Sequence, residues 1–391
     1  MNKKSVILLV TLCVAPLSVF AQERVEALCE YNGVRLYVDF AAANVGRCRI
    51  AHRRFVLDIL PEDEPINPSP WYAFRLEGEG VARIELSYGS HKHRYMPKIS
   101  TDKKVWTALD RRKLSRISRG ARVRFSLNIE QPIWVAAQEI MDLDFYETWL
   151  QGLSQDLSDL KLTEFGRSAA GLPLWVAQTN PTAVNAILLV GRQHPPELTG
   201  ALAMLAYVEE LLAMEREAAA GKCEGPACTF FSDTNIVIAP LLNPDGVQRG
   251  YWRHNIGGLD LNRDWGHFSQ PETQAVKRLI DEISAQSQLR LFIDFHSTRE
   301  NLFYIQTDDD ITRPLNFSRR WLQAARREGV YRFSIEPRGT SDQLTSKNYI
   351  YKRFGVPAIV YEVGDETRRS SVDASARVFA RQMVRTLYPY K

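Results

Sequence analysis

The stretch that decides the fold is Ile187-Leu-Leu-Val-Gly-Arg-Gln-His-Pro-Pro-Glu197. Its apolar half belongs to a run, 186–190, that predicts a short buried strand ended by Gly191. His194 and Glu197 follow, at the exit of that strand and at the start of the next helix. An imidazole and a carboxylate placed in this way can bind one metal ion, and catalytic zinc usually takes three such ligands and leaves one position for water. The His-x-x-Glu spacing alone is a weak signal, so its interpretation depends on the rest of the chain.

The second half of the chain has the pattern of an α/β domain. After Gly171, apolar segments alternate with long amphipathic ones, as in a sheet that helices cover on both faces. A capping box from Ser269 to Glu272 predicts the start of one helix, and Gly329 the end of another. We expect strands at 172–178, 186–190, 235–239, 291–295, 302–305 and 358–363, and helices at 198–219, 272–284, 317–328 and 372–387.

The first half has a β pattern instead. Short alternating segments separated by turn residues predict a small antiparallel β-sandwich. They lie at 34–40, 55–59, 71–75, 81–86 and 123–129. We therefore predict a mixed α/β sheet covered by helices on both faces and preceded by a small antiparallel β-sandwich. The domain division that follows is a signal peptide at 1–21, a sandwich domain at 22–136 and an α/β domain at 137–391.

The N-terminus predicts export. Lys3 and Lys4 precede an apolar run, 6–14, and a small-residue cleavage site ends at Ala21, which together are typical of a secretory signal. No later stretch is long enough for a membrane span, so we expect a periplasmic or secreted protein without stable membrane insertion. Four cysteines remain after cleavage, which fits two disulfides in an exported chain. The simplest pairing is local: Cys29–Cys48 and Cys223–Cys228.

Charge argues against a nucleic-acid partner. The chain has 50 Lys and Arg against 46 Asp and Glu, and loss of the two signal lysines leaves 48 against 46, a net charge of +2. No basic run is interleaved with aromatic residues, as a nucleic-acid-binding surface would require.

Polar residues gather just past the predicted strand ends or within the strands, where open α/β sheets place ligands. Most of them have a structural explanation when taken alone, since Asn-Pro-Asp-Gly is a good turn and a single His can be a core residue. Glu362 is the hardest to explain in this way, because a carboxylate inside a buried strand is costly unless it is paired or used. The clusters are His194 with Glu197, Asn243–Gly246 with Arg253 and 260–264, Asp294–Ser297, and Tyr361-Glu362.

Together these side chains form one inventory for metal-assisted amide hydrolysis. His194, Glu197 and His296 supply three zinc ligands. Glu362 can act as the base for the attacking water, and Arg253 as a fixed cation for the oxyanion. The guanidinium of Arg263 can bind a terminal carboxylate in a bidentate manner, with the amide of Asn262 donating beside it.

At these residues the sequence resembles the zinc metallocarboxypeptidases, and among them the cytosolic-carboxypeptidase-like branch. The likeness is carried by 192–197, 243–247, Arg253, 260–263, 295–297 and 361–362, and more loosely by 71–75 and 95–97. It implies one zinc ion per chain on His194, Glu197 and His296, with Glu362 as general base and acid. It also implies that Arg253 polarises the scissile carbonyl, that Asn262 and Arg263 hold the substrate carboxylate, and that a tyrosine, Tyr349 or Tyr351, closes over the substrate.

We therefore expect a zinc carboxypeptidase that acts on peptides with a free C-terminal carboxylate. Two alternatives stay open: a zinc endopeptidase or amidase acting on peptidoglycan peptides, and a binding module with a vestigial metal site. The branch is named for intracellular members, so its glutamate-trimming members are an unsafe guide to the substrate of an exported chain. Arg338 and Lys347, on the loop 336–350, would favour an acidic C-terminal residue if either points into the pocket. The oligomeric state is left open.

Overall fold

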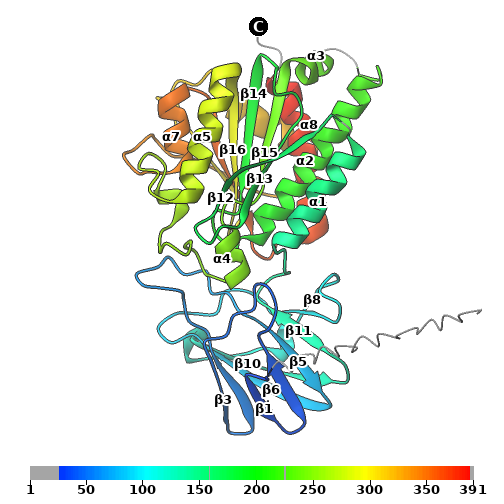
Figure 1. Cartoon of the computed structure of the whole chain (residues 1–391), viewed down its shortest axis with the longest axis vertical. Coiled ribbons are helices and arrows are strands. Elements are labelled where there is room, and N and C mark those ends of the chain that lie inside the picture. The colour runs from blue at the N-terminus through cyan, green and yellow to red at the C-terminus, as the bar shows by residue number, and fades with distance from the viewer. Residues whose placement is uncertain (1–25, 158, 224–225, 388–391) are drawn as a thin grey trace, which may run out of the picture.

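A computed structural model of the chain describes residues 26–157, 159–223 and 226–387. The predicted signal, 1–21, lies outside these residues. The β-rich N-terminal part, blue to cyan, occupies one end of the long axis, and the α/β part occupies the other (Figure 1). Within the described residues, none of the helices is long and apolar enough to cross a membrane.

The N-terminal part is a sandwich of two sheets, with strand orders β1-β2-β5-β11-β7-β8 and β3-β4-β6-β10-β9. All its strand pairs are antiparallel except β4 with β6, which is parallel. Alternation explains the packing: along β6, Ala82, Ile84 and Leu86 enter the core while Val81 stays exposed. The strands are β1 Cys29–Tyr31, β2 Val34–Tyr37, β3 Arg47–Ala51, β4 Arg54–Asp58, β5 Ala73–Gly78, β6 Gly80–Ser87, β7 Lys98–Ser100, β8 Thr107–Ala108, β9 Ser115–Ile117, β10 Arg122–Ile129 and β11 Ile133–Ala136.

The α/β part is built on an eight-stranded mixed sheet in the order β12-β13-β15-β14-β16-β19-β17-β18. Its centre is parallel, with β15, β14, β16 and β19 running side by side in one direction. The carboxyl ends of these strands therefore meet at one edge of the sheet. The strands are β12 Lys161–Arg167, β13 Pro173–Gln178, β14 Asn185–Gly191, β15 Thr234–Ala239, β16 Gln288–Thr298, β17 Leu302–Ile305, β18 Ser334–Pro337 and β19 Ala358–Gly364.

Helices cover both faces of this sheet (Figure 1). Strand β14 shows why, because its side chains alternate between two apolar clusters. Ile187 and Leu189 pack in the cluster that holds α2, α6 and α8, while Leu188 and Val190 pack in the cluster that holds α5 and α7. The helices are α1 Leu143–Asp156, α2 Leu198–Ala219, α3 Pro226–Asp233, α4 Pro244–Arg249, α5 Pro271–Gln286, α6 Phe317–Arg327, α7 Ser346–Phe354 and α8 Arg369–Leu387.

The predicted fold class is confirmed, and the six expected strands and four expected helices of the α/β part are all present. The expected capping box is wrong. Helix α5 starts at Pro271 with Gln270 as its N-cap, and that cap makes no side-chain hydrogen bond. The Glu272 carboxylate instead accepts hydrogen bonds from Ala169 N at 2.9 Å and Asn255 Nδ2 at 3.0 Å.

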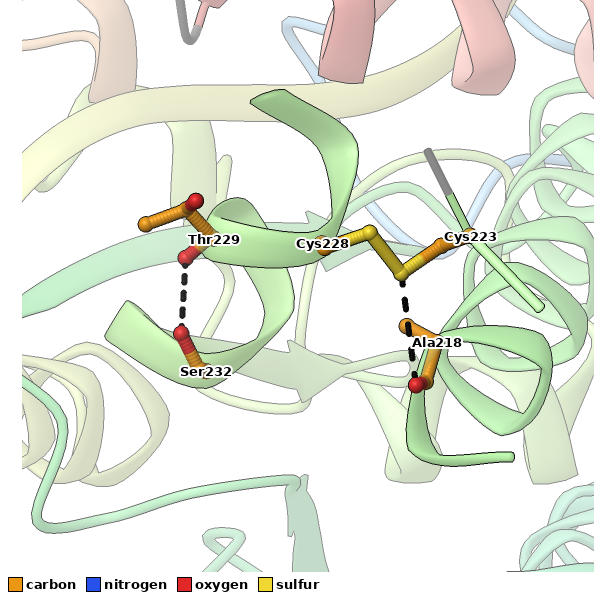
Figure 2. Close-up of a disulfide and its surroundings, with 5 residues drawn as sticks. All are labelled: Ala218, Cys223, Cys228, Thr229 and Ser232. Carbon is orange, nitrogen blue, oxygen red and sulfur yellow. Dashed lines mark hydrogen bonds between the residues drawn. A yellow bond between two sulfur atoms is a disulfide. The ribbon is translucent and has the colours of Figure 1, made fainter. Parts of the chain in front are cut away.

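Both expected disulfides are present. Cys29–Cys48 joins β1 of one sandwich sheet to β3 of the other, with 6.0 Å between the Cα atoms. Cys223–Cys228 connects the segment after α2 to α3 (Figure 2). In the same region the Cys223 sulfur lies 4.0 Å from the carbonyl oxygen of Ala218, in the last turn of α2.

Candidate active site

Three neighbouring strands bring the predicted metal ligands and base together. His194 and Glu197 follow β14, and Glu197 is the N-cap residue of α2. His296 lies in β16 and is paired in register with Glu362 of β19. Because β14 and β16 are parallel neighbours, the rings of His194 and His296 come within 4.9 Å of each other, centroid to centroid.

A glycine sets the spacing between the helix and the strand that carry these ligands. A Cβ atom at Gly200 would lie 2.2 Å from the carbonyl oxygen of His296, so only glycine allows α2 to come this near to β16. The backbone N–H of Gly200 donates to Ser297 Oγ at 2.7 Å, and Thr199 Oγ1 donates to the same oxygen at 2.9 Å. Direct backbone contact therefore fixes the distance between Glu197 and His296.

The ligand atoms converge on one point. Glu197 Oε1 lies 2.9 Å from His194 Nδ1, and Glu197 Oε2 lies 2.7 Å from His296 Nδ1. All three side chains are buried, and their ligand atoms lie within 4.8 Å of one another. Burial alone would raise the pKa of Glu197, but the two histidines hold it well below its usual range, so the carboxylate stays ionised. Two imidazoles and one carboxylate form a donor set that is typical of catalytic zinc.

The outer ring nitrogens of both histidines contact carboxylates. His194 Nε2 lies 2.9 Å from Asp260 Oδ1, and His296 Nε2 lies 2.9 Å from Asp294 Oδ2. Such a contact holds the proton on Nε2 and leaves the Nδ1 lone pair free for a metal. The arrangement around the rings therefore fits a bound zinc ion as well as the donor set does.

Glu362 faces the same point from β19. It lines the cavity beside the three ligands, and its Oε2 is buried without a hydrogen-bond partner among the described residues. Burial raises the pKa of Glu362 to about 7, against the opposing effect of His296. A buried carboxylate oxygen without a partner is costly, and a water molecule beside the metal would satisfy it.

Asp260 links the predicted oxyanion cation to the ligands. Arg253 donates to Asp260 Oδ2 through Nε at 2.8 Å, and its Nη2 lies 2.7 Å from the same oxygen. Burial would raise the pKa of Asp260, but His194 and Arg253 hold it far below its usual range. The guanidinium of Arg253 is thus fixed at the cavity wall by a charged partner.

Asn262 and Arg263 line the cavity next to this group. Asn262 Nδ2 lies 3.3 Å from His296 Nε2, and its Oδ1 accepts from Ser346 N at 2.9 Å. Arg263 donates to the carbonyl oxygen of Asn262 at 2.7 Å, and half of its side chain remains exposed. Its guanidinium can therefore still bind an anion in the cavity.

The cavity has a volume of about 680 Å³ and a strongly cationic wall. Arg338 and Lys347 both belong to this wall, and Lys347 Nζ donates to the carbonyl oxygen of Arg338 at 2.8 Å. Among its described lining residues the carboxylates are those of Glu197 and Glu362. The cations are Arg94, Arg253, Arg263, Arg299, Arg338 and Lys347.

The expected closing tyrosine lies elsewhere. The Tyr349 ring packs against Trp265 and Phe268 in the core beneath α7, and its hydroxyl accepts from Arg353 at 2.7 Å. Neither Tyr349 nor Tyr351 is among the lining residues of the cavity. The physical reason is that both lie on a regular helix rather than on the open loop that the prediction assumed.

Several lining residues were not predicted. Tyr304 on β17 reaches the cavity, and so does Arg94 of the sandwich, which donates to both oxygens of Asp365 at 2.8 and 3.1 Å. Asp294 belongs to the sequence cluster Asp294–Ser297 but is assigned no role in the site from the sequence alone. Its position two residues before His296 in a strand places both side chains on one face, and this spacing was the available signal. For Arg94 there was none, because its partner is 271 residues away.

Comparison with known proteins finds cytosolic carboxypeptidases among the similar sequences. Human cytosolic carboxypeptidase 2 is 29% identical over 157 residues, which are 37% of this chain and 16% of that protein. Human cytosolic carboxypeptidase 6 is 29% identical over 116 residues, 28% of this chain and 21% of that one. The chain thus spans about a fifth or less of the length of these relatives.

Similarity to solved structures extends over both parts of the fold. A metallo-carboxypeptidase from Pseudomonas aeruginosa, solved in complex with (2-guanidinoethylmercapto)succinic acid, has a TM-score of 0.71 at 18% identity. One from Burkholderia cenocepacia has a TM-score of 0.70 at 18% identity. Each comparison covers 90% of this chain and 98% of the other. The family model described as zinc carboxypeptidase (Peptidase_M14) matches residues 146–368, more than half of the sequence, so this chain belongs to the zinc carboxypeptidase family.

Proposed function

We propose that this protein hydrolyses the C-terminal peptide bond of peptides, with one zinc ion held by His194, Glu197 and His296. The observation that carries the proposal is the convergence of these three buried ligands at a cavity that Glu362 also lines, its Oε2 having no hydrogen-bond partner among the described residues. Zinc, when bound, supplies Lewis-acid polarisation and lowers the pKa of water at the site.

The other side chains handle protons and charge. Glu362 removes a proton from the attacking water and delivers it to the leaving amine, because its Oε2 is buried without a partner among the described residues and the side chain lines the cavity next to the ligands. Arg253 stabilises the negative charge that develops on the scissile carbonyl oxygen, since Asp260 fixes its guanidinium before substrate arrives.

Recognition of the chain end is assigned to Asn262 and Arg263. The half-exposed guanidinium of Arg263 can form a bidentate pair with a carboxylate, and the amide of Asn262 lies beside it. This pair makes the enzyme an exopeptidase rather than an endopeptidase or an amidase.

The cavity wall favours an acidic residue at the substrate C-terminus. Arg338 and Lys347 both line the cavity, and Arg299 adds a further cation. Beyond Arg253 and Arg263, the described wall carries four more cations, and its two carboxylates are those of the proposed ligand Glu197 and the proposed base Glu362. Peptides ending in Glu should therefore be cleaved faster than peptides ending in Leu or Lys.

We also propose that the protein acts outside the cytoplasm, after export by the 1–21 signal, with 22–136 and 137–391 as its two domains. The two disulfides support this location because such bonds persist in oxidising compartments. Its substrates would then be extracellular peptides, including the stem peptides of cell walls.

The test compares one peptide with a free C-terminus and the same peptide as the C-terminal amide. Amidation should remove most turnover, and Arg263→Ala should raise KM for the free peptide with a small effect on the amide. The control is Arg385→Ala, which removes a surface arginine of α8 that forms an ion pair with Glu328. Equal cleavage of both peptides would favour the endopeptidase or amidase alternative.

A further inference from the structure

The loop that carries Arg253 has little regular structure of its own. This arginine loop, residues 250–260, connects α4, which ends at Arg249, to the 3-10 turn Leu261–Arg263. Some of its backbone N–H groups find acceptors within the loop or in α4, but those next to Arg253 need acceptors from elsewhere in the molecule. For these groups the structure places the acceptor on the N-terminal sandwich (strands β1 to β11), about 190 residues earlier in the chain.

One carboxylate accepts from three consecutive N–H groups of this loop. Glu62 Oε2 accepts from Trp252 N at 2.7 Å, while Oε1 accepts from Arg253 N at 2.8 Å and from His254 N at 2.7 Å. Glu62 lies on the connection between β4 and β5 of the sandwich. Successive N–H groups that point at one anion make a strong, directional cradle.

Two further contacts hold the same loop against the sandwich. The indole of Trp252 is fully buried in the apolar core of the sandwich. Asn44 Nδ2 donates to the carbonyl oxygen of Gly250 at 2.7 Å. The residue before Arg253 and the backbone on either side of it are therefore held by the sandwich, in addition to a hydrogen bond from Asn243 Nδ2 of the α/β part to the carbonyl oxygen of His254 at 3.0 Å.

Glu62, Asp63 and His254 also place ligand atoms within 4.8 Å of one another, as a metal site would. Glu62 nevertheless has both oxygens engaged by N–H donors, and Asp63 Oδ1 contacts His254 Nδ1 at 2.6 Å. This group is thus already satisfied within the protein, which indicates an anchor for the loop.

We infer that Glu62 is a positioning residue for the hydrolytic reaction: through the backbone of Arg253 it holds the guanidinium at the place where the oxyanion develops. The inference rests on the proposed role of Arg253. The chain of contacts runs from Glu62 to Arg253 N, from the Arg253 guanidinium to Asp260, and from Asp260 to the ligand His194. It gives the sandwich a part in the chemistry, since a displacement of about 1 Å at such a group can cost about 100-fold in rate.

The test uses the zinc-loaded full chain and measures kcat and KM with a free-carboxylate peptide. Glu62→Gln, which replaces one acceptor oxygen by a donor, should lower kcat about tenfold, and Glu62→Ala by about 10- to 100-fold. KM should stay within about threefold, because Asn262 and Arg263 are untouched. Metal analysis should give one zinc per chain in every variant. Asp58→Asn, a sandwich carboxylate paired with Arg49, is the control and should match the parent.

A double-mutant cycle separates positioning from general destabilisation. In an Arg253→Ala background, Glu62→Gln should cost less than about twofold more, because the group it positions is gone. An equal loss in both backgrounds, or a kcat for Glu62→Gln within about twofold of the parent, would overturn the inference. If Arg253→Ala itself kept full turnover, the proposed role of Arg253 would fail first. An impaired Arg253→Ala beside an unimpaired Glu62→Gln would reject only the positioning role.

Discussion

Two glutamates in the site are driven to opposite protonation behaviour by their surroundings. Glu197 keeps a pKa well below its usual range because two imidazoles contact it, whereas burial raises the pKa of Glu362 to about 7 against the opposing effect of His296. In enzyme active sites with two such carboxylates, the one with the lowered pKa usually stays ionised as a ligand or charge stabiliser. The one with the raised pKa usually transfers the proton. This contrast supports the proposed division of roles, with Glu197 as ligand and Glu362 as base.

Replacing Glu362 by Gln should leave the shape of the site intact and remove the proton acceptor. We expect kcat to fall by about 10²- to 10⁴-fold, as for the loss of a general base, while metal analysis still finds one zinc per chain. Glu300→Gln, an exposed carboxylate after β16, should have no effect on turnover. A Glu362→Gln enzyme with undiminished kcat would assign the base to another group.

Lys347 should make the acidic preference depend on pH. Burial lowers its pKa to about 8, so its ammonium is charged below pH 8 and neutral above it. The ratio of kcat/KM for Glu-ending over Leu-ending peptides should therefore fall about fivefold, roughly 1 kcal/mol, between pH 6.5 and 9.5. Lys347→Arg keeps its charge across this range, so its ratio should stay flat. A similar decline in both proteins would show that another group controls the preference.

A site residue could be predicted from the sequence where the residues next to it already mark it as unusual. His194, Glu197, His296 and Glu362 stand at strand ends or break an apolar strand, and the parallel strands then bring them together. Arg94 could not be predicted in this way, because its partner Asp365 is 271 residues away and no nearby sequence pattern marks it. Tyr349 does not line the cavity in the structure, where a short polar helix, α7, takes the place of the expected loop.

Strong periodicity also decided which secondary-structure elements could be predicted. Strand β14 is apolar throughout and helix α2 is long, so both were expected at nearly their observed bounds. Strands β12 and β18 are partly exposed and polar, and α7 has nine residues, so tertiary packing rather than sequence pattern defines them. The start of α5 was right within one residue although its supposed cap was wrong.

The two disulfides should contribute unequally to stability. Cys29–Cys48 spans 19 residues and connects two sheets, whereas Cys223–Cys228 spans five. By loop length, removing the first with a double Cys→Ala change should lower the free energy of unfolding by about 3 kcal/mol, and removing the second by about 2 kcal/mol. Urea unfolding of the two double variants measures the difference. A larger loss at Cys223–Cys228 would contradict this order.

Over the molecule as a whole, zinc should act as a stabilising ligand. The ligands come from segments about 100 residues apart, 194–197 and 296, so an unfolded chain cannot present them together. At zinc concentrations about 100 times Kd, binding adds about 2.7 kcal/mol, and a chelator should lower Tm by about 3–5 °C. His296→Ala should show nearly the same Tm with and without chelator. An unchanged Tm in the parent would speak against a zinc site built from these residues.

The cavity is enclosed from two sides, by strand ends and loops of the α/β part and by Asn67, Pro68, Ser69 and Arg94 of the sandwich. A space of about 680 Å³ admits a few amino acids and nothing as thick as a packed helix pair or sheet. Under the proposed function, the enzyme would therefore shorten an unfolded C-terminal tail and would leave the same residues intact where they are packed in a folded domain. The enzyme would in this way select substrates first by whether their C-terminal segment is unfolded, and only then by the side chain at the C-terminus.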